Sequence, residues 1–89
     1  MGDQQPIDPS RPVYVWQQVA DHIARRIQTG ELRAGARLEG ERELAEHLGV
    51  AVGTVRRAIE DLRERGLVVT LAAKGTYIAN DPAEETGQP

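Results

Sequence analysis

Cysteine and phenylalanine are absent from this chain of 89 residues, whose only aromatic residues are one tryptophan and two tyrosines. Without cysteine, the chain can form neither a disulfide framework nor a thiolate metal site. Its two histidines, His22 and His47, are isolated in the sequence, and no glycine-rich phosphate loop or cluster of metal ligands occurs. We therefore expect one small domain with no enzyme activity, no metal and no cofactor.

Long hydrophobic runs are also absent. No apolar stretch approaches the roughly 20 residues needed to span a bilayer, and the N-terminus lacks the basic-then-apolar order of a secretory signal. The hydrophobic fraction of 39% and the charged fraction of 28% are typical of a soluble globular protein. We expect a cytoplasmic protein with no membrane partner.

An excess of positive charge is missing as well, because the formal net charge is -3. Residues 13–80 contain ten Lys or Arg and nine Asp or Glu, whereas residues 1–12 contribute -1 and residues 81–89 contribute -3. The acidity therefore lies mainly in the two tails. DNA affinity depends on the face presented and not on the sum, so the net charge does not exclude nucleic acid as a partner.

Residues 41–66, ERELAEHLGVAVGTVRRAIEDLRERG, have the pattern of two helices separated by a tight turn. In the first, apolar residues recur at helical spacing up to Gly49, where a left-handed residue commonly ends a helix. Ala45 supplies the small side chain that two crossing helices require. The second has one apolar stripe, formed by Val52, Val55, Ile59 and Leu62. The pattern predicts a helix-turn-helix that presents residues 52–65 to a DNA major groove, with an ordinary helical hairpin as the alternative.

The segments before this region are expected to be an arm, a helix and a connector. Residues 1–12 hold three of the five prolines and predict a disordered N-terminal arm. Residues 13–29 have helical periodicity, and Trp16 on this helix is interpreted as a core residue or a dimer anchor. In the connector, residues 31–40, we expect a very short strand at Leu38. Gly40 can cap the next helix, with Glu43 as half of a capping box.

The segment after the two helices changes to a β pattern. Residues 67–71 and 76–79 are β-formers separated by the short loop Ala72-Ala73-Lys74-Gly75, which predicts a hairpin. A hairpin directly after a helix-turn-helix is a wing. We thus expect a folded domain at residues 13–79 and an acidic disordered tail, or the remnant of a linker, at residues 80–89.

Four segments carry a resemblance to a known family: VWQQVADHIARRIQTGEL, ARLEGERELAEHLGV, TVRRAIEDLRERGLV and KGTYIA. They are similar to the winged helix-turn-helix of the GntR family of bacterial transcription regulators, over essentially all of residues 13–79. The resemblance implies an α+β, mainly helical fold, in which three helices are followed by a two-stranded β-hairpin wing. It also implies a sequence-specific DNA-binding regulator, interpreted as a repressor that reads a palindromic operator.

The departures from the family pattern bear on specificity. Glu39 and Gly40 stand where the family has Pro-Ser, so a hydroxyl cap is lost. Val52 replaces an arginine that contacts bases in the family, and Ala73 replaces a glycine of the wing. Arg57 occupies a place where the family often has glutamate. We therefore expect a specificity that differs from that of typical members.

The candidate DNA-binding residues combine small or polar side chains with cations, because the backbone must approach the base edges while cations bind phosphates. They are Arg42, Val52, Gly53, Thr54, Arg56, Arg57, Lys74, Gly75 and Thr76. Helical geometry predicts that Arg57 points outward, opposite the apolar stripe, and that Arg56 lies on its flank. For each arginine alone, a solvated surface charge or an i,i+4 ion pair is the alternative.

The partners follow from the same interpretation. We expect double-stranded operator DNA and a homodimer that is weak or depends on DNA. Family members normally carry a large effector-binding domain, which this chain lacks, so it is either a truncated domain or a small stand-alone member. The alternative function is a winged-helix module that binds another protein and not DNA, in which an apolar Val52 inserts into the partner.

Overall fold

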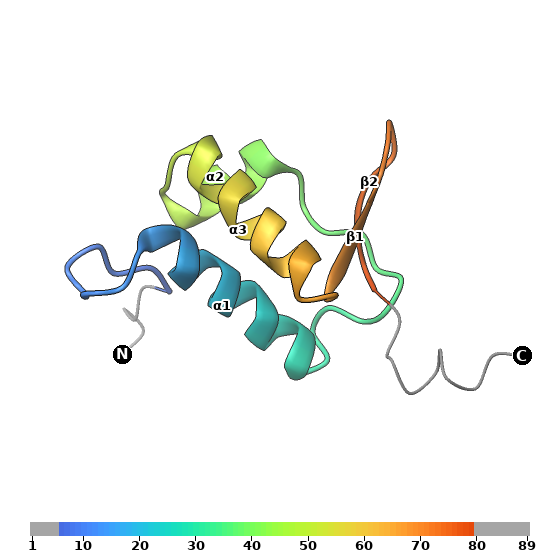
Figure 1. Cartoon of the computed structure of the whole chain (residues 1–89), viewed down its shortest axis with the longest axis horizontal. Coiled ribbons are helices and arrows are strands. Elements are labelled where there is room, and N and C mark those ends of the chain that lie inside the picture. The colour runs from blue at the N-terminus through green and yellow to red at the C-terminus, as the bar shows by residue number, and fades with distance from the viewer. Residues whose placement is uncertain (1–5, 80–89) are drawn as a thin grey trace, which may run out of the picture.

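The computed structural model describes residues 6–79 and contains three helices followed by an antiparallel hairpin (Figure 1). The elements are α1 Val15–Gln28, α2 Glu41–Leu48, α3 Val52–Glu64, β1 Val68–Leu71 and β2 Gly75–Ile78. The predicted α+β class, element order and wing are confirmed, with boundaries that differ by one or two residues. Among the described residues, no helix has the length and apolar character required to cross a membrane.

The core lies where the apolar stripes of the three helices meet the base of the hairpin. Helices α1 and α3 run side by side, and α2 crosses the leading end of α3 (Figure 1). The side chains with essentially no exposure are Val19, Ala20, Ile23, Val55, Ala58 and Leu62. Because every third or fourth residue of each helix contributes, the position of α3 is fixed by burial along its inner face.

The turn between α2 and α3 has the predicted geometry. Gly49 ends α2 in the left-handed conformation, with a φ of 70°. Its N–H and that of Val50 both donate to the carbonyl of Ala45, at 2.8 and 3.0 Å. Gly40 is the N-cap of α2, as predicted, but no side-chain hydrogen bond caps this helix, so the expected capping box with Glu43 is wrong.

The wing is joined on its inner edge by part of the connector. In the hairpin, Val68 pairs with Ile78 and Leu71 pairs with Gly75. On the other edge of β2, residues 35–38 make three backbone hydrogen bonds, which we call the connector seam. Its bonds run from Gly35 N to Ile78 O (2.9 Å), from Ile78 N to Ala36 O (2.8 Å) and from Leu38 N to Thr76 O (2.8 Å). The short strand expected at Leu38 is thus a single bridge one residue earlier, between Arg37 and Tyr77.

Residues 6–12 correct the expectation of a disordered arm over residues 1–12. The Ile7 side chain is buried in the core, with 6% exposure. The buried Gln18 amide of α1 accepts a hydrogen bond from Asp8 N (2.8 Å) and donates to the carbonyls of Asp8 and Val13 (both 3.0 Å). This segment folds onto α1 because one apolar side chain and one satisfied amide hold it. Residues 1–5 and the predicted tail at residues 80–89 lie outside the described residues.

Candidate nucleic-acid interface

The outward face of α3 begins with bare backbone. Gly53 is exposed, and a Cβ added to it would have no heavy atom within 4 Å. The edge of a DNA base could therefore approach the α3 backbone closely at this position. Neither Ala51 nor any other side chain caps it, so its first N–H groups remain available for hydrogen bonds.

Three of the candidate residues meet in a groove between α2 and the start of α3. Arg42, Val52 and Arg56 line this groove together with Ala45 and the turn residues Val50 and Ala51. The Arg56 Nε donates to Glu41 Oε1 at 2.9 Å, and both side chains are largely exposed. The structure thus places Arg42 and Arg56 on one flank of the helix, as a phosphate-binding arrangement requires.

Arg57 does not extend freely into solvent. Its guanidinium carbon lies 4.1 Å from the centre of the Trp16 ring on α1. Its Nη1 is 4.0 Å from Glu60 Oε1. Trp16 in turn stacks with Tyr14, at 6.3 Å between ring centres and 13° between planes. Trp16 is only half-buried and does not belong to the buried core. No sequence pattern indicated this contact, because its two residues are on different helices and Arg57 lies close to the outward face.

Thr54 lies apart from Arg42 and Arg56, on the same side of α3 as Arg57. Its half-buried side chain lines a hollow on the α1 side of α3, together with Ile7, Val15 and Gly49. Residues 54 and 56 differ by 200° around a helix, so they occupy opposite flanks. Thr54 and Arg56 therefore cannot contact the same group.

The wing tip is a tight turn that exposes Lys74. The Lys74 N–H donates to Leu71 O at 2.9 Å, and Ala73, the third residue of the turn, has a φ of 66°. Gly75 follows with a φ of 132°, and a Cβ there would lie 2.8 Å from Arg37 Nε. Thr76 is half-buried, with its hydroxyl 3.2 Å from that of Thr70. Lys74 is thus the most accessible candidate of the wing, whereas Gly75 is required by backbone geometry.

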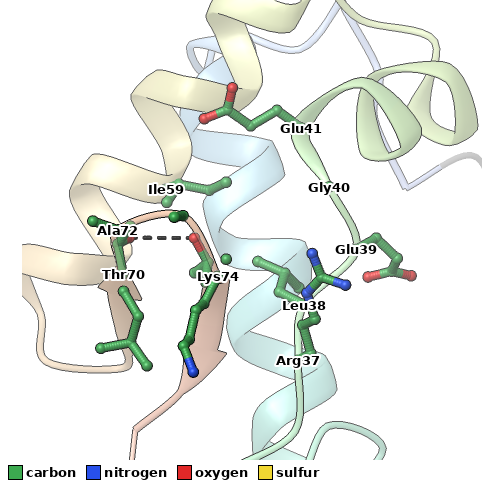
Figure 2. Close-up of a pocket in the computed structure, with 13 residues that line it drawn as sticks. Arg37, Leu38, Glu39, Gly40, Glu41, Ile59, Thr70, Ala72 and Lys74 are labelled. Carbon is green, nitrogen blue, oxygen red and sulfur yellow. Dashed lines mark hydrogen bonds between the residues drawn. The ribbon is translucent and has the colours of Figure 1, made fainter.

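Arg37 is a further cation near the wing that was not among the residues predicted from the sequence. This exposed residue lines the groove between connector and wing, beside Thr70, Lys74 and Gly75 (Figure 2). The groove continues past Gly40 to the start of α2. Arg37 belongs to the segment ARLEGERELAEHLGV, so its place in that motif was the signal that could have identified it. It adds a second cation beside Lys74.

The cations at the far end of α1 have a structural role. Arg26 donates to both carboxylate oxygens of Glu39 at 3.2 Å and to Glu31 at 2.9 Å. Burial by itself raises the pKa of the Glu39 carboxyl, but the hydrogen bonds and the charge of Arg26 outweigh burial and hold that pKa below its usual 4.5. Glu39, which stands where the resemblance expects proline, thus ties the connector to α1.

The described residues contain no group of three or more His, Asp or Glu side chains that could hold a metal ion. Within residues 6–79, the charged side chains near the start of α3 and at the wing instead form two cationic edges. One contains Arg42 and Arg56, with Glu46 in the same groove, and the other contains Arg37 and Lys74, with Glu39 in the same groove. Glu41 lies between them and pairs with Arg56.

Comparisons of sequence and of structure with known proteins lead to the same group, the bacterial transcription regulators. The family model described as "Bacterial regulatory proteins, gntR family" matches residues 16–78. The chain is 40% identical over 75 residues to the HTH-type transcriptional regulator SmoD of Agrobacterium fabrum, covering 82% of this chain and 31% of that protein. It is 32% identical over 82 residues to the HTH-type transcriptional repressor NagR of Bacillus subtilis, covering 92% of this chain and 34% of that protein.

A solved structure shares the fold along nearly its whole length. The DNA-binding domain of AraR in complex with its operator ORE1 superposes with a TM-score of 0.75 and 30% identity. The match covers 85% of this chain and 93% of that one. This chain, however, spans only about a third of the length of the two curated relatives.

Proposed function

This chain belongs to the gntR family of bacterial regulatory proteins, and on that premise we propose that it is a sequence-specific DNA-binding transcription regulator that acts as a repressor. Helix α3 enters the major groove of a palindromic operator, and the β1–β2 wing contacts the adjacent sugar-phosphate backbone. The protein acts in the cytoplasm, where bacterial DNA lies. The relative NagR is named a repressor, and the AraR domain is held on an operator.

The observation that carries this proposal is the bare leading end of α3 between two cationic edges. A major groove about 12 Å wide admits a helix whose leading residues are small, and Gly53 leaves the α3 backbone open. Arg42 and Arg56 flank it on the α2 side. The wing tip with Lys74 lies on the same side of the molecule as α2, away from α1 (Figure 1). One DNA surface can therefore contact both edges.

Two copies of the chain bind the two halves of the operator in this proposal. Each copy reads one half-site, and the half-sites are separated by about one helical turn or less. The dimer is weak or forms only on DNA. A tight dimer at micromolar concentration without DNA, measured by sedimentation, would contradict this part of the proposal while leaving DNA binding itself intact.

The test is a salt titration of binding to a library of randomised duplexes. We expect wild type to enrich a palindrome and to lose affinity steeply with salt, because phosphate contacts release counterions. Arg56→Ala should weaken binding, while the matched control Arg33→Ala removes an exposed charge from the connector, outside the contact surface, and should bind like wild type. No binding at low salt, together with capture of a protein partner through Val52, would favour the protein-binding alternative.

A further inference from the structure

The strongest feature that the proposed function leaves unexplained is the stack of Arg57 on Trp16. The two residues belong to different helices, and the guanidinium lies 4.1 Å from the ring centre, within the range of a cation–π interaction. Tyr14 extends the stack outward and is 74% exposed. The stack therefore reaches from the leading end of α1 to the outer face of α3.

The position of Arg57 on α3 directs it toward the proposed DNA surface. Arg57 comes one turn after Gly53, and long side chains on a helix lean back over the preceding turn. Gly53 has no side chain and open space above it. Residues 53 and 57 differ by about 40° around the helix, so Arg57 shares the bare face of α3. Its guanidinium lies to the α1 side of that face, over Trp16, and leaves the space above Gly53 open.

The chemistry of the contact leaves Arg57 able to read a base. A guanidinium carries its five N–H groups around its edge, whereas an aromatic ring contacts its flat face. With the guanidinium carbon over its ring, Trp16 contacts this group without accepting a hydrogen bond from the N–H donors. Arg56 is different, because its Nε already donates to Glu41 at 2.9 Å. The Glu60 carboxylate is 4.0 Å from Arg57 and exposed, so it competes weakly for the same edge.

We propose that Trp16 is a positioning residue for base recognition, which fixes the plane of the Arg57 guanidinium so that its N–H edge meets a guanine in the major groove. This inference rests on the proposed function. Arginine that bonds both O6 and N7 of guanine is the commonest base-specific contact, and it depends on the orientation of the guanidinium plane. Trp16 itself need not touch DNA.

The experiment measures base preference and affinity separately. Duplexes from the enriched operator are varied one base pair at a time, and binding is compared for wild type, Arg57→Ala, Trp16→Leu, Trp16→Phe and the double variant. We expect Arg57→Ala to lose roughly five- to hundredfold discrimination at one G·C pair. Trp16→Leu should lose about two- to fivefold at the same pair, and Trp16→Phe should lose less because its ring still accepts the cation.

The double variant decides whether Trp16 acts through Arg57. In the Arg57→Ala background, Trp16→Leu should cause no further loss at that base pair. A Trp16→Leu effect that is equal at all positions, or that persists without Arg57, would overturn the inference. Thermal melts verify folding, and Trp16→Phe supplies the readout if the leucine variant unfolds. If wild type selects no sequence at all, the proposed function fails and the inference fails with it.

Discussion

Replacing Ala73 with glycine should stabilise the protein, although glycine usually destabilises a chain. Ala73 is the one residue other than glycine with a positive φ among residues 6–79, at 66°. It is the third residue of a turn closed by the hydrogen bond from Lys74 N to Leu71 O. Positive φ at that place is typical of a type II turn, which favours glycine or asparagine. The Cβ of alanine is therefore strained there.

The magnitude follows from two opposing terms. Left-handed backbone costs a residue with a Cβ roughly 1–2 kcal/mol, and glycine adds about 0.4–1 kcal/mol of conformational entropy to the unfolded chain. The difference between the two terms is a net gain of roughly 0–1.6 kcal/mol for Ala73→Gly, with a midpoint of about 0.8 kcal/mol. Because Val68 and Ile78 of the wing belong to the core, the gain should stabilise the whole domain. For a domain of this size, the midpoint gain raises Tm by about 3–6 °C.

The adjacent residue supplies the control. Ala72 is in the same loop and does not have a positive φ, so Ala72→Gly should only increase unfolded-chain entropy and lower Tm by a few degrees. Both variants are melted side by side and followed by circular dichroism. If Ala73→Gly melts at the wild-type temperature or below, or if the two variants shift in the same direction, the argument from backbone strain is wrong.

Three further changes have defined outcomes. Burial, with the charges of Arg26 and Arg25, lowers the pKa of His22 below 6.5, so the unfolded state binds a proton that the folded state does not. Stability should therefore fall as the pH drops below about 6.5. In His22→Gln, the urea midpoint of unfolding should change less between pH 7 and 5.5 than it does in wild type. If the midpoint changes with pH equally in both proteins, His22 is not the cause. Glu39→Gln should cost about 1 kcal/mol in urea unfolding at pH 7. The pKa of Glu39 is lowered in the folded protein, so the stability that its charge contributes is fully present above pH 4.5 and is lost as the pH falls through the lowered pKa. The destabilisation of Glu39→Gln should therefore shrink below pH 4.5. A destabilisation that is independent of pH would show that the charge is not involved. Val52→Arg restores the arginine that contacts bases in the family pattern, so it should change the base pair preferred at one position of the selected operator, by about 1–3 kcal/mol of discrimination; an unchanged selected sequence would show that residue 52 does not face a base edge.

The helices and the turn were predictable because their signals are local. Apolar residues at helical spacing bury one face of each helix, and Gly49 ends α2 in the left-handed conformation that its position indicated. The wing was predictable for the same reason, since the β-forming runs are separated by a short loop. These features depend on residues that are close in the chain.

The missed features all depend on partners distant in sequence. Gln18 is of a residue type usually found at the surface, yet it is buried, because its amide forms hydrogen bonds with the backbone of residues 8 and 13. Glu39 stands where the family pattern has proline, and its carboxylate binds Arg26 on α1. Arg57 was correctly placed near the outer face by helical geometry, but its contact with Trp16 required the packing of α1 on α3. Periodicity cannot supply such pairings, because it describes one element at a time.

The connector seam closes a loop. Its hydrogen bonds join residues 35–38 to β2, and every residue of α2 and α3 lies in the chain between these two joined segments. A chain without cysteine thereby has a noncovalent cross-link at the base of its helix-turn-helix. The link forms only when residues 35–38 meet β2, and closing this long loop costs chain entropy during folding. We infer that the sheet is completed late, after α2 and α3 have packed, and that unzipping the seam would release the connector from β2 while Val68 and Ile78 still hold the wing in the core.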